Sequence, residues 1–464
     1  MSNILTGADF DGAIDGFGAH SVDKLDELNK ALGTGTSGAA YGDTADGSAL
    51  RPESLEGTLK VVIATDKHIK FWKDLYKKPA YNTVEEFNVL DSYGGEATPF
   101  FTEGGLPSEE DSSYERKTAL VKFMGTTRVI THPMTLVRSA HGDVVARETR
   151  NGTLWLMQQQ ERKLFFGNSA LDALEYDGVE KQIIDKVGAG GEQIIDMKGQ
   201  PLNENTLEDA SNIILENYGS PSKLYLTPKA HVDLSKIMFP RQRIGFNAPT
   251  DGQAGIPLTG FQSNAGNFGF EPDVFLRPRG AAPTEARTGA PASVVFKAVD
   301  PLVAATSTTG VGLKAGTYSY QVTAVNLAGE SAGQTAATVA VTANQQVTVS
   351  FVRLTAGAVK SYRIYRDNGD GTVLFMTEIP QPTTGTNVDF IDRNENIPGT
   401  SKAFMLDLDN DQSMAYKQLA PLMKLPLARI SASERFMILL YGMPIVYNPR
   451  RNVVIKNIGG YVPE

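Results

Sequence analysis

Three aspartates toward the C-terminal end have a spacing that could hold a calcium ion. Asp407, Asp409 and Asp411 alternate along the chain, as the first ligands of a calcium-binding loop do. Such a loop next needs a glycine and later a bidentate acid, but the sequence has Gln412 and Gln418 in those places. The pattern therefore favours a solvated linker over a metal site.

The other residues that could do chemistry also lack the spacing that chemistry requires. The run Asp-Asn-Gly-Asp-Gly at 367–371 looks calcium-like, but its ligand spacing fails, and a hairpin turn between Tyr365 and Val373 is favoured. The acids at 109–111 could form a hydrolytic pair, yet in a Gly/Ser-rich segment a charge patch is favoured. The histidines show neither an HExxH motif nor paired metal spacing. They are His20, His68, His132, His141 and His231.

Motifs of the common enzyme classes are missing from the sequence. It has no cysteine, no G-x-S-x-G elbow, no phosphate-binding loop and no dinucleotide fingerprint. We therefore predict no catalytic residue, no metal ligand and no cofactor. The lack of cysteine also fits assembly in a reducing cytoplasm.

The composition is that of a folded acidic protein larger than one domain. Of 464 residues, 41% are hydrophobic and 21% charged, and the formal net charge is −9. A chain beyond about 250–300 residues usually divides into domains. No basic stripe indicates phosphate binding. The longest apolar run, 436–447, is far shorter than the roughly 20 residues of a membrane span, and no apolar signal region is present, so we expect a soluble protein without a membrane partner.

Residues 1–50 are predicted to form an arm and not a core. They contain eight acids, Asp23 and Asp26 among them, against Lys24 and Lys30, with several Gly-rich stretches. Such a segment cannot bury enough apolar surface to fold alone. We expect it to lie against a neighbouring subunit.

A globular pattern begins at Leu50. Apolar periodicity and β-branched runs predict a strand at 58–65 and helices at 67–76, 143–166 and 205–218. Gly152 interrupts the second helix. Residues 86–124 have the pattern of a long hairpin with a Gly/Ser/acid-rich tip, and so long an excursion usually has a binding purpose.

Residues 283–402 change in character. They alternate apolar and polar residues in about seven short runs, separated by Gly, Pro and Asn, which is typical of an immunoglobulin-like or fibronectin III-like sandwich. The runs include 293–296, 318–325, 338–342, 347–351 and 362–365. Prolines mark both borders, and globular sequence resumes at Leu419, so this part is predicted to be an inserted domain.

Several stretches together carry a resemblance to a known family. The strongest is Leu-Ala-Pro-Leu-Met-Lys-Leu-Pro-Leu-Ala-Arg-Ile-Ser-Ala-Ser at 419–433; the others are 71–80, 114–123, 176–179 and 449–458. In this order they resemble the major capsid proteins of large contractile-tailed phages of Gram-positive bacteria, the staphylococcal Twort-like group in particular. The resemblance covers most of residues 50–464, and the order of the matches carries it, not any single motif.

The resemblance implies an α+β fold of the Hong Kong 97 phage capsid type. Its expected parts are an N-terminal arm at 1–50, a capsid core at 51–282 with an extended loop at 86–120 and a spine helix at 143–166, the insert at 283–402, and a C-terminal return to the axial and peripheral domains at 403–464. The axial domain would draw on 200–280 and 415–448.

The resemblance also implies a structural protein and not an enzyme. The chain would self-assemble into hexamers and pentamers of an icosahedral head around non-specifically held double-stranded DNA, in the virion, after assembly in the host bacterial cytoplasm. Its partners would include the portal and, as in some relatives, scaffold, maturation protease or decoration proteins, and the insert could attach to a surface glycan. The charged residues expected at intersubunit contacts are Asp23, Asp26, Glu103, Glu109, Glu110, Arg116 and Lys117.

Two alternatives stay open. A phage tail or baseplate adhesin would predict β-rich sequence throughout. A carbohydrate-active enzyme with a sandwich module would predict a signal peptide and a catalytic carboxylate pair.

Overall fold

The computed structural model describes residues 65–95, 98–137, 142–242, 258–307, 312–335, 338–369, 371–409 and 411–461. They form a mixed α+β structure, as predicted. The arm predicted at 1–50 lies outside the described residues, as does all but the last residue of the strand predicted at 58–65.

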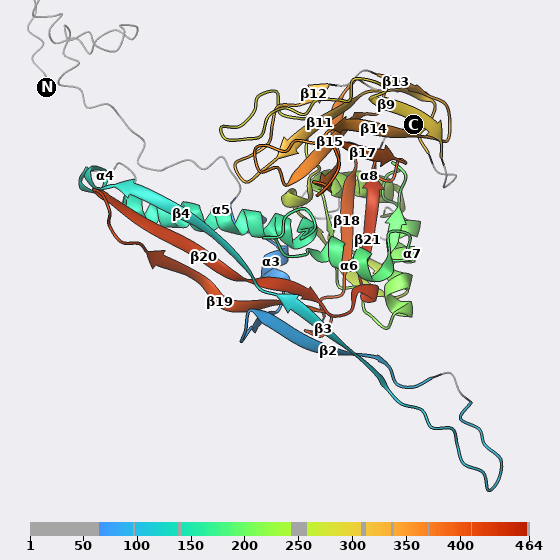
Figure 1. Cartoon of the computed structure of the whole chain (residues 1–464). Coiled ribbons are helices and arrows are strands. Elements are labelled where there is room, and N and C mark those ends of the chain that lie inside the picture. The colour runs from blue at the N-terminus through green and yellow to red at the C-terminus, as the bar shows by residue number, and fades with distance from the viewer. Residues whose placement is uncertain are drawn as a thin grey trace, which may run out of the picture. The chain divides into compact units, whose positions relative to one another are not determined.

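A long helix and a four-stranded sheet form the first packed unit (Figure 1). The sheet order is β1 (Lys77–Pro79), β19 (Met414–Pro426), β20 (Ser433–Val446) and β4 (Lys122–Thr131). Helix α5 (Val144–Phe166) lies along β4 and β20, and the helix predicted at 143–166 is confirmed. Because side chains alternate along a strand, Phe436, Ile438 and Leu440 of β20 all face the helix and pack in one core.

Gly152 marks the closest approach between α5 and this sheet. A Cβ atom at this position would lie 2.6 Å from Cδ1 of Ile438. A glycine in a helix interior costs about 1 kcal/mol relative to alanine. Here the missing side chain allows the helix to pack directly on the strand.

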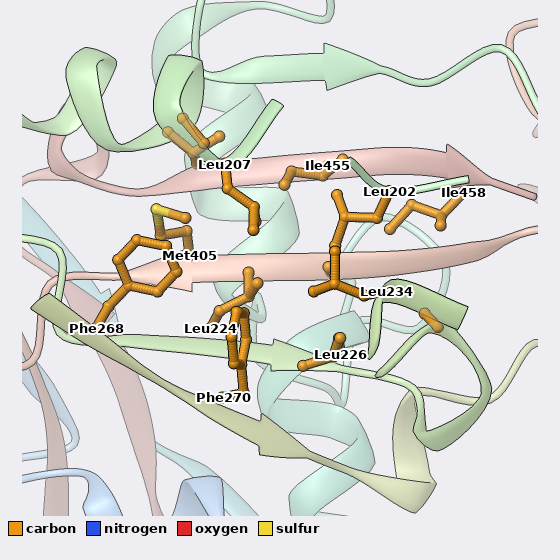
Figure 2. Close-up of a cluster of buried hydrophobic side chains, with 14 of the residues drawn as sticks. Leu202, Leu207, Leu224, Leu226, Leu234, Phe268, Phe270, Met405, Ile455 and Ile458 are labelled. Carbon is orange, nitrogen blue, oxygen red and sulfur yellow. The ribbon is translucent and has the colours of Figure 1, made fainter. Parts of the chain in front are cut away.

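A six-stranded sheet forms the second unit. Its order is β5 (Ile194–Asp196), β21 (Val453–Ile458), β18 (Ser401–Leu406), β6 (Lys223–Leu226), β8 (Gly266–Pro272) and β7 (Gly260–Ser263). Helices α7 (Glu204–Glu216) and α8 (Pro228–Gln242) contribute Leu207 and Leu234 to its core, which Figure 2 shows among side chains from β6, β8, β18 and β21. The helix predicted at 205–218 is confirmed.

The expectation that 415–448 joins 200–280 is wrong. Strands β19 and β20 cover that segment, and they pair with β1 and β4 in the four-stranded sheet. The physical reason is the long pairing of β20 with β4, which aligns ten residues of β20. In this register the alternating apolar side chains of β20 lie on the face of the sheet that α5 covers.

An aromatic core joins the two units. Phe71 stacks on Phe165 with ring centroids 4.5 Å apart, and Phe165 also lies against Phe404 of the six-stranded sheet at 5.0 Å. Tyr225 and Tyr416 complete the same cluster. Helix α6 (Val179–Val187) closes it through Val179 and Ile183.

The single helix predicted over 67–76 is wrong. The chain instead forms a 3₁₀ turn, η2 (Asp66–His68), and one turn of α-helix, α3 (Phe71–Asp74). The buried carboxylate of Glu161 accepts hydrogen bonds from the backbone N–H groups of residues 70–72, which fixes the start of α3 there. Helix α3 cannot continue beyond this turn, because from Lys77 onward the chain pairs with β19 as strand β1. Tertiary contacts therefore override the apolar spacing.

The segment between Arg277 and Ser401 has a β-sheet core of its own. One sheet contains β9 (Leu302–Thr306), β14 (Gln345–Val352) and β17 (Asn387–Asp392); another contains β11 (Tyr320–Val325), β12 (Gln334–Thr335), β15 (Ser361–Asp367) and β16 (Val373–Pro380); β10 (Gly316–Tyr318) pairs with β13 (Val339–Val341). Val322, Val349, Phe351 and Ile364 bury each other between these sheets.

Two local predictions in this segment have different outcomes. The hairpin turn between Tyr365 and Val373 is confirmed, because Asp367 pairs with Val373 and its carboxylate accepts from the backbone N–H of Gly369 at 2.8 Å. The run at 293–296 forms only an isolated bridge, Phe296 to Phe351.

Candidate assembly surface

The β2–β3 hairpin is a two-stranded sheet by itself. Strands β2 (Val84–Ser92) and β3 (Ser113–Leu120) pair antiparallel, and among the described strands no third one joins them. The hairpin predicted within 86–124 is thus confirmed. A lone two-stranded sheet is at best marginally stable in water, so contacts at its base must hold it.

Those contacts lie where the hairpin leaves the four-stranded sheet. Phe87 meets Tyr447 edge-on, with ring centroids 5.2 Å apart. The carboxylate of Glu85 accepts from the backbone N–H of Tyr81 at 2.8 Å and pairs with Lys417 at 3.3 Å. The Tyr81 hydrogen bond, followed by Lys417, lowers the pKa of Glu85 below its ordinary value. The base is therefore anchored by both apolar and ionic contacts.

The loop between the two strands exposes large apolar side chains. Tyr93 is 88% exposed, Phe100 86% and Leu106 93%. Burying one such side chain contributes roughly 1.5–3 kcal/mol, which this chain by itself does not gain. Phe100 and the adjacent Phe101 are both exposed. Neighbouring exposed apolar groups usually mark an interaction site, so the loop has the chemistry of a contact with another protein surface.

A second apolar surface lies on the four-stranded sheet. Helix α5 covers the face that carries Phe436, Ile438 and Leu440. Strand alternation places Phe123 and Val129 of β4 on the opposite face, where they are 60% and 54% exposed. The sheet thus has one buried apolar face and one open face.

The charged residues predicted at subunit contacts fall into separate parts of the chain. Asp23 and Asp26 lie outside the described residues. Glu103, Glu109 and Glu110 are exposed on the loop, where Glu110 accepts from the backbone N–H of Gly95 at 2.6 Å.

Arg116 and Lys117 lie on β3 and use acids of their own hairpin. Arg116 pairs with Glu86 at 3.4 Å and Lys117 with Glu115 at 3.5 Å. Lys186 of α6 also reaches Glu115, at 3.4 Å. Lys117, followed by Lys186, lowers the pKa of Glu115. Within the described residues the structure does not bring these two bases to the acids of the loop.

Sequence reasoning missed the apolar residues of the loop. The sequence pattern predicts contacts through the acids of the loop, whereas large apolar side chains such as Phe100 and Leu106 are exposed there as well. The available signal was the presence of bulky apolar residues inside a Gly/Ser/acid-rich segment that cannot form a core.

The three aspartates with calcium-like spacing point to separate partners. Asp409 accepts from the Ser222 hydroxyl at 2.7 Å, and Asp411 pairs with Lys78 at 2.8 Å. Asp407 is 2% exposed, so the solvated linker that the sequence favoured is wrong at this residue. Burial raises the pKa of Asp407. No group of three metal-ligating side chains occurs in the described part of the chain.

A buried pair of carboxyls, Glu161 and Asp273, supports the core beneath these surfaces. Burial, then the charge of Asp273, raises the pKa of Glu161 to about 7. Burial raises the pKa of Asp273 to about 6. Asp273 also caps η3 (Val274–Leu276) by accepting from the backbone N–H of Phe275 at 2.7 Å. Their hydrogen bonds to backbone amides indicate a structural role.

Helices that could cross a membrane are missing from the described residues, because none is both long enough and apolar enough.

Comparisons with known proteins place this chain beside phage capsid proteins. No family model matches it. It is 26% identical to the "Putative major capsid protein" of Enterococcus phage phiEF24C, over 93% of this chain and 95% of the relative. It is 25% identical to the "Major capsid protein" of Staphylococcus phage K, over 89% and 91%. The solved capsid of cyanophage P-SCSP1u aligns over 93% of this chain and 97% of its own, at 9% identity and a TM-score of 0.45. The predicted resemblance is confirmed: along nearly its whole length this chain is similar to major capsid proteins of Enterococcus and Staphylococcus phages.

Proposed function

We propose that this chain is the structural subunit of a phage head, a major capsid protein that self-assembles into the shell of the virion. The observation that carries this function is the end-to-end similarity to proteins of that name. The apolar loop and the open sheet face are consistent with it, because shell subunits need surfaces that other copies cover.

The elements described above support a Hong Kong 97-type arrangement. In it the β2–β3 hairpin is the extended loop, α5 is the spine helix of the peripheral domain with the four-stranded sheet, and the six-stranded sheet is the axial domain. The N-terminal arm at 1–50 and the hairpin would overlap neighbouring copies in hexamers and pentamers. The charged residues of the hairpin, Arg116 and Lys117 included, would then meet acids across subunit boundaries.

We also assign the segment 283–402 as an immunoglobulin-like insert. Its short antiparallel strands around a separate core support this assignment. A surface position, with attachment to glycans, is a function that such a domain could add. Particles that lack residues 283–402 and still adsorb normally would exclude the attachment role.

The remaining partners follow from the role of a head subunit. Double-stranded DNA would be confined without specific contacts, which suits a chain of net charge −9. Portal, scaffold, maturation protease and decoration proteins would meet the shell during assembly in the host cytoplasm. The role is structural, without catalysis or a cofactor.

Electron microscopy of the purified chain, expressed alone and with neighbouring phage genes, tests the proposal. Closed shells, tubes or rings of five and six subunits are the expected result. Slender trimers would favour the tail adhesin, and a dispersed monomer in every condition would favour the enzyme with a sandwich module.

A pair of matched variants tests the role of the loop. Phe100→Ser combined with Phe101→Ser should leave the fold of the free chain unchanged, because the side chains are 86% and 59% exposed, but should prevent closed particles from forming. Leu327→Ser, at a residue 77% exposed in the insert, is the control and should assemble normally. Normal particles from the double variant would remove the loop from the assembly contacts.

A further inference from the structure

A cavity of about 360 Å³ lies where α5, α6 and the six-stranded sheet meet β16 of the insert. This volume is within the range of small-molecule sites. Among the charged residues of its lining the basic ones outnumber the acids: they are Arg162, Lys181, Arg277, Arg279, Lys402 and Lys456. The acids there are Glu180, Glu378 and Glu395. In a chain whose net charge is −9, this excess of cations is opposite in sign to the whole protein.

The acids in the lining are paired with bases, some of which also line the cavity. Glu378 accepts from Nε of Arg363 at 2.9 Å and lies 3.6 Å from Arg279. Glu180 pairs with Lys402. Glu395 lies 4.0 Å from Arg393, and Lys181 pairs with Asp185. Among the lining cations, Arg162, Arg277 and Lys456 therefore remain without an ion pair to a described residue.

Arg162 is a cation of the lining that forms no direct ion pair with a described residue. It lies on α5 and is partly buried, and no described residue forms an ion pair or hydrogen bond with its side chain. Burial, followed by the positive charges of Arg279 and Arg363, lowers the pKa of Arg162 to about 10, although the negative charge of Glu378 acts in the opposite direction. Lys456 of β21 likewise has no ion pair with a described residue. A partly buried cation beside others is costly unless an anion joins it.

The rest of the wall is partly apolar, with polar residues such as Asn168 and Thr377 among the apolar ones. Phe166, Ile184, Leu276, Phe375 and Met376 line the cavity with the cations. Small-molecule sites commonly combine a mostly apolar wall with a few polar groups that fix the orientation of the ligand.

We propose that this cavity binds a small organic anion, with its phosphate or carboxylate group held by Arg162 and Lys456 and its apolar part against Phe166 and Phe375. Such a ligand contacts α5 and β21 on one side and β16 on the other, so it ties the insert to the rest of the chain. This site is independent of the shell contacts assigned above.

Calorimetry on the purified full-length chain tests the site. The probes are inorganic phosphate, phenyl phosphate and benzoate at matched ionic strength, so that phosphate and carboxylate head groups are distinguished. At least one of the two aromatic probes should bind, more tightly than inorganic phosphate, and more weakly as salt is raised. Amide exchange at residues 375–378 should slow in its presence.

The variants remove one charge at a time. Arg162→Gln should weaken binding by about tenfold or more, since it removes a partly buried partner of the anion. Lys297→Gln removes an exposed charge outside the cavity and should leave affinity unchanged. If circular dichroism shows that Arg162→Gln is unfolded, Lys456→Gln replaces it with the same expectation. Failure of both aromatic probes to bind, or equal loss in Lys297→Gln, would overturn the proposal.

Discussion

A single ion pair in residues 283–402, the segment proposed as an insert, should control the stability of the β-sheet core there. Arg366 and Asp392 are 1% and 2% exposed, and Nη1 of Arg366 lies 2.6 Å from Oδ2 of Asp392. Asp392 also accepts from the hydroxyl of Tyr320 at 2.8 Å and from the backbone N–H of Asn394 at 2.8 Å. The pair therefore joins β15, β17 and β11 at one buried point.

We predict that Arg366→Met destabilises the insert by about 3 kcal/mol. Removing one partner of a buried pair costs roughly 3–5 kcal/mol because the other charge stays buried, and the two remaining donors to Asp392 place the cost at the lower end. That loss corresponds to roughly 100-fold faster exchange of amides that open with the insert core. Hydrogen exchange followed by mass spectrometry, with peptides from β14 and β17 against peptides from α7, measures it.

Two further variants separate the pair from a general effect of losing arginine. Arg366→Met with Asp392→Asn should recover most of the lost protection, because no buried charge remains. Arg393→Met, which breaks a pair with Glu395 at 4.0 Å at the surface, should cost at most about 1 kcal/mol. Exchange in Arg366→Met within about threefold of wild type, or a double variant as labile as the single one, would refute the reasoning.

Two other predictions concern the core between α5 and the sheets. Gly152→Ala should destabilise the chain by about 1–3 kcal/mol despite the better helix propensity of alanine, because its Cβ would lie 2.6 Å from Cδ1 of Ile438. Adding Ile438→Val removes that Cδ1 atom and should restore part of the lost stability, measured by urea unfolding. A double variant that recovers no stability would contradict the packing argument. The second prediction concerns pH. Burial raises the pKa of Glu161 from 4.5 to about 7, so the folded chain binds the proton of this carboxyl more tightly than the unfolded chain does. The resulting stabilisation of the folded state is complete below about pH 4.5 and is lost as the pH rises through about 7. Urea midpoints should therefore fall between about pH 5 and pH 8 in wild type and fall less in Glu161→Gln, whereas parallel curves would exclude this carboxyl.

Local pattern in the sequence was sufficient for elements whose apolar face is regular. The helices at 143–166 and 205–218 and the hairpin within 86–124 were predicted because periodicity and turn residues agree there. A glycine inside the pattern at 143–166 counts against a helix there. The reason for Gly152 is its close approach to Ile438, a residue so distant in the chain that local sequence does not reveal the contact.

Predictions failed where a distant partner decides the local structure. The chain at 67–76 has helical spacing, but Glu161 and β19 divide it. The sheet to which 415–448 belongs depends on pairing with β4, which alternation alone does not specify. The cationic cavity draws on α5, β16 and β21, so no local motif could have indicated it.

The order of strands in the six-stranded sheet limits when this protein can become complete. Strand β21, which ends at Ile458, lies between β5 and β18, and β18 in turn lies next to β6. Until residues 453–458 have left the ribosome, β5 has no neighbour in this sheet and one side of β18 is unpaired. Domains generally fold as units during synthesis, with N-terminal segments first. In this protein β5 must wait for β21, so a product truncated before residue 453 lacks the finished sheet and is a poor competitor for places among completed copies.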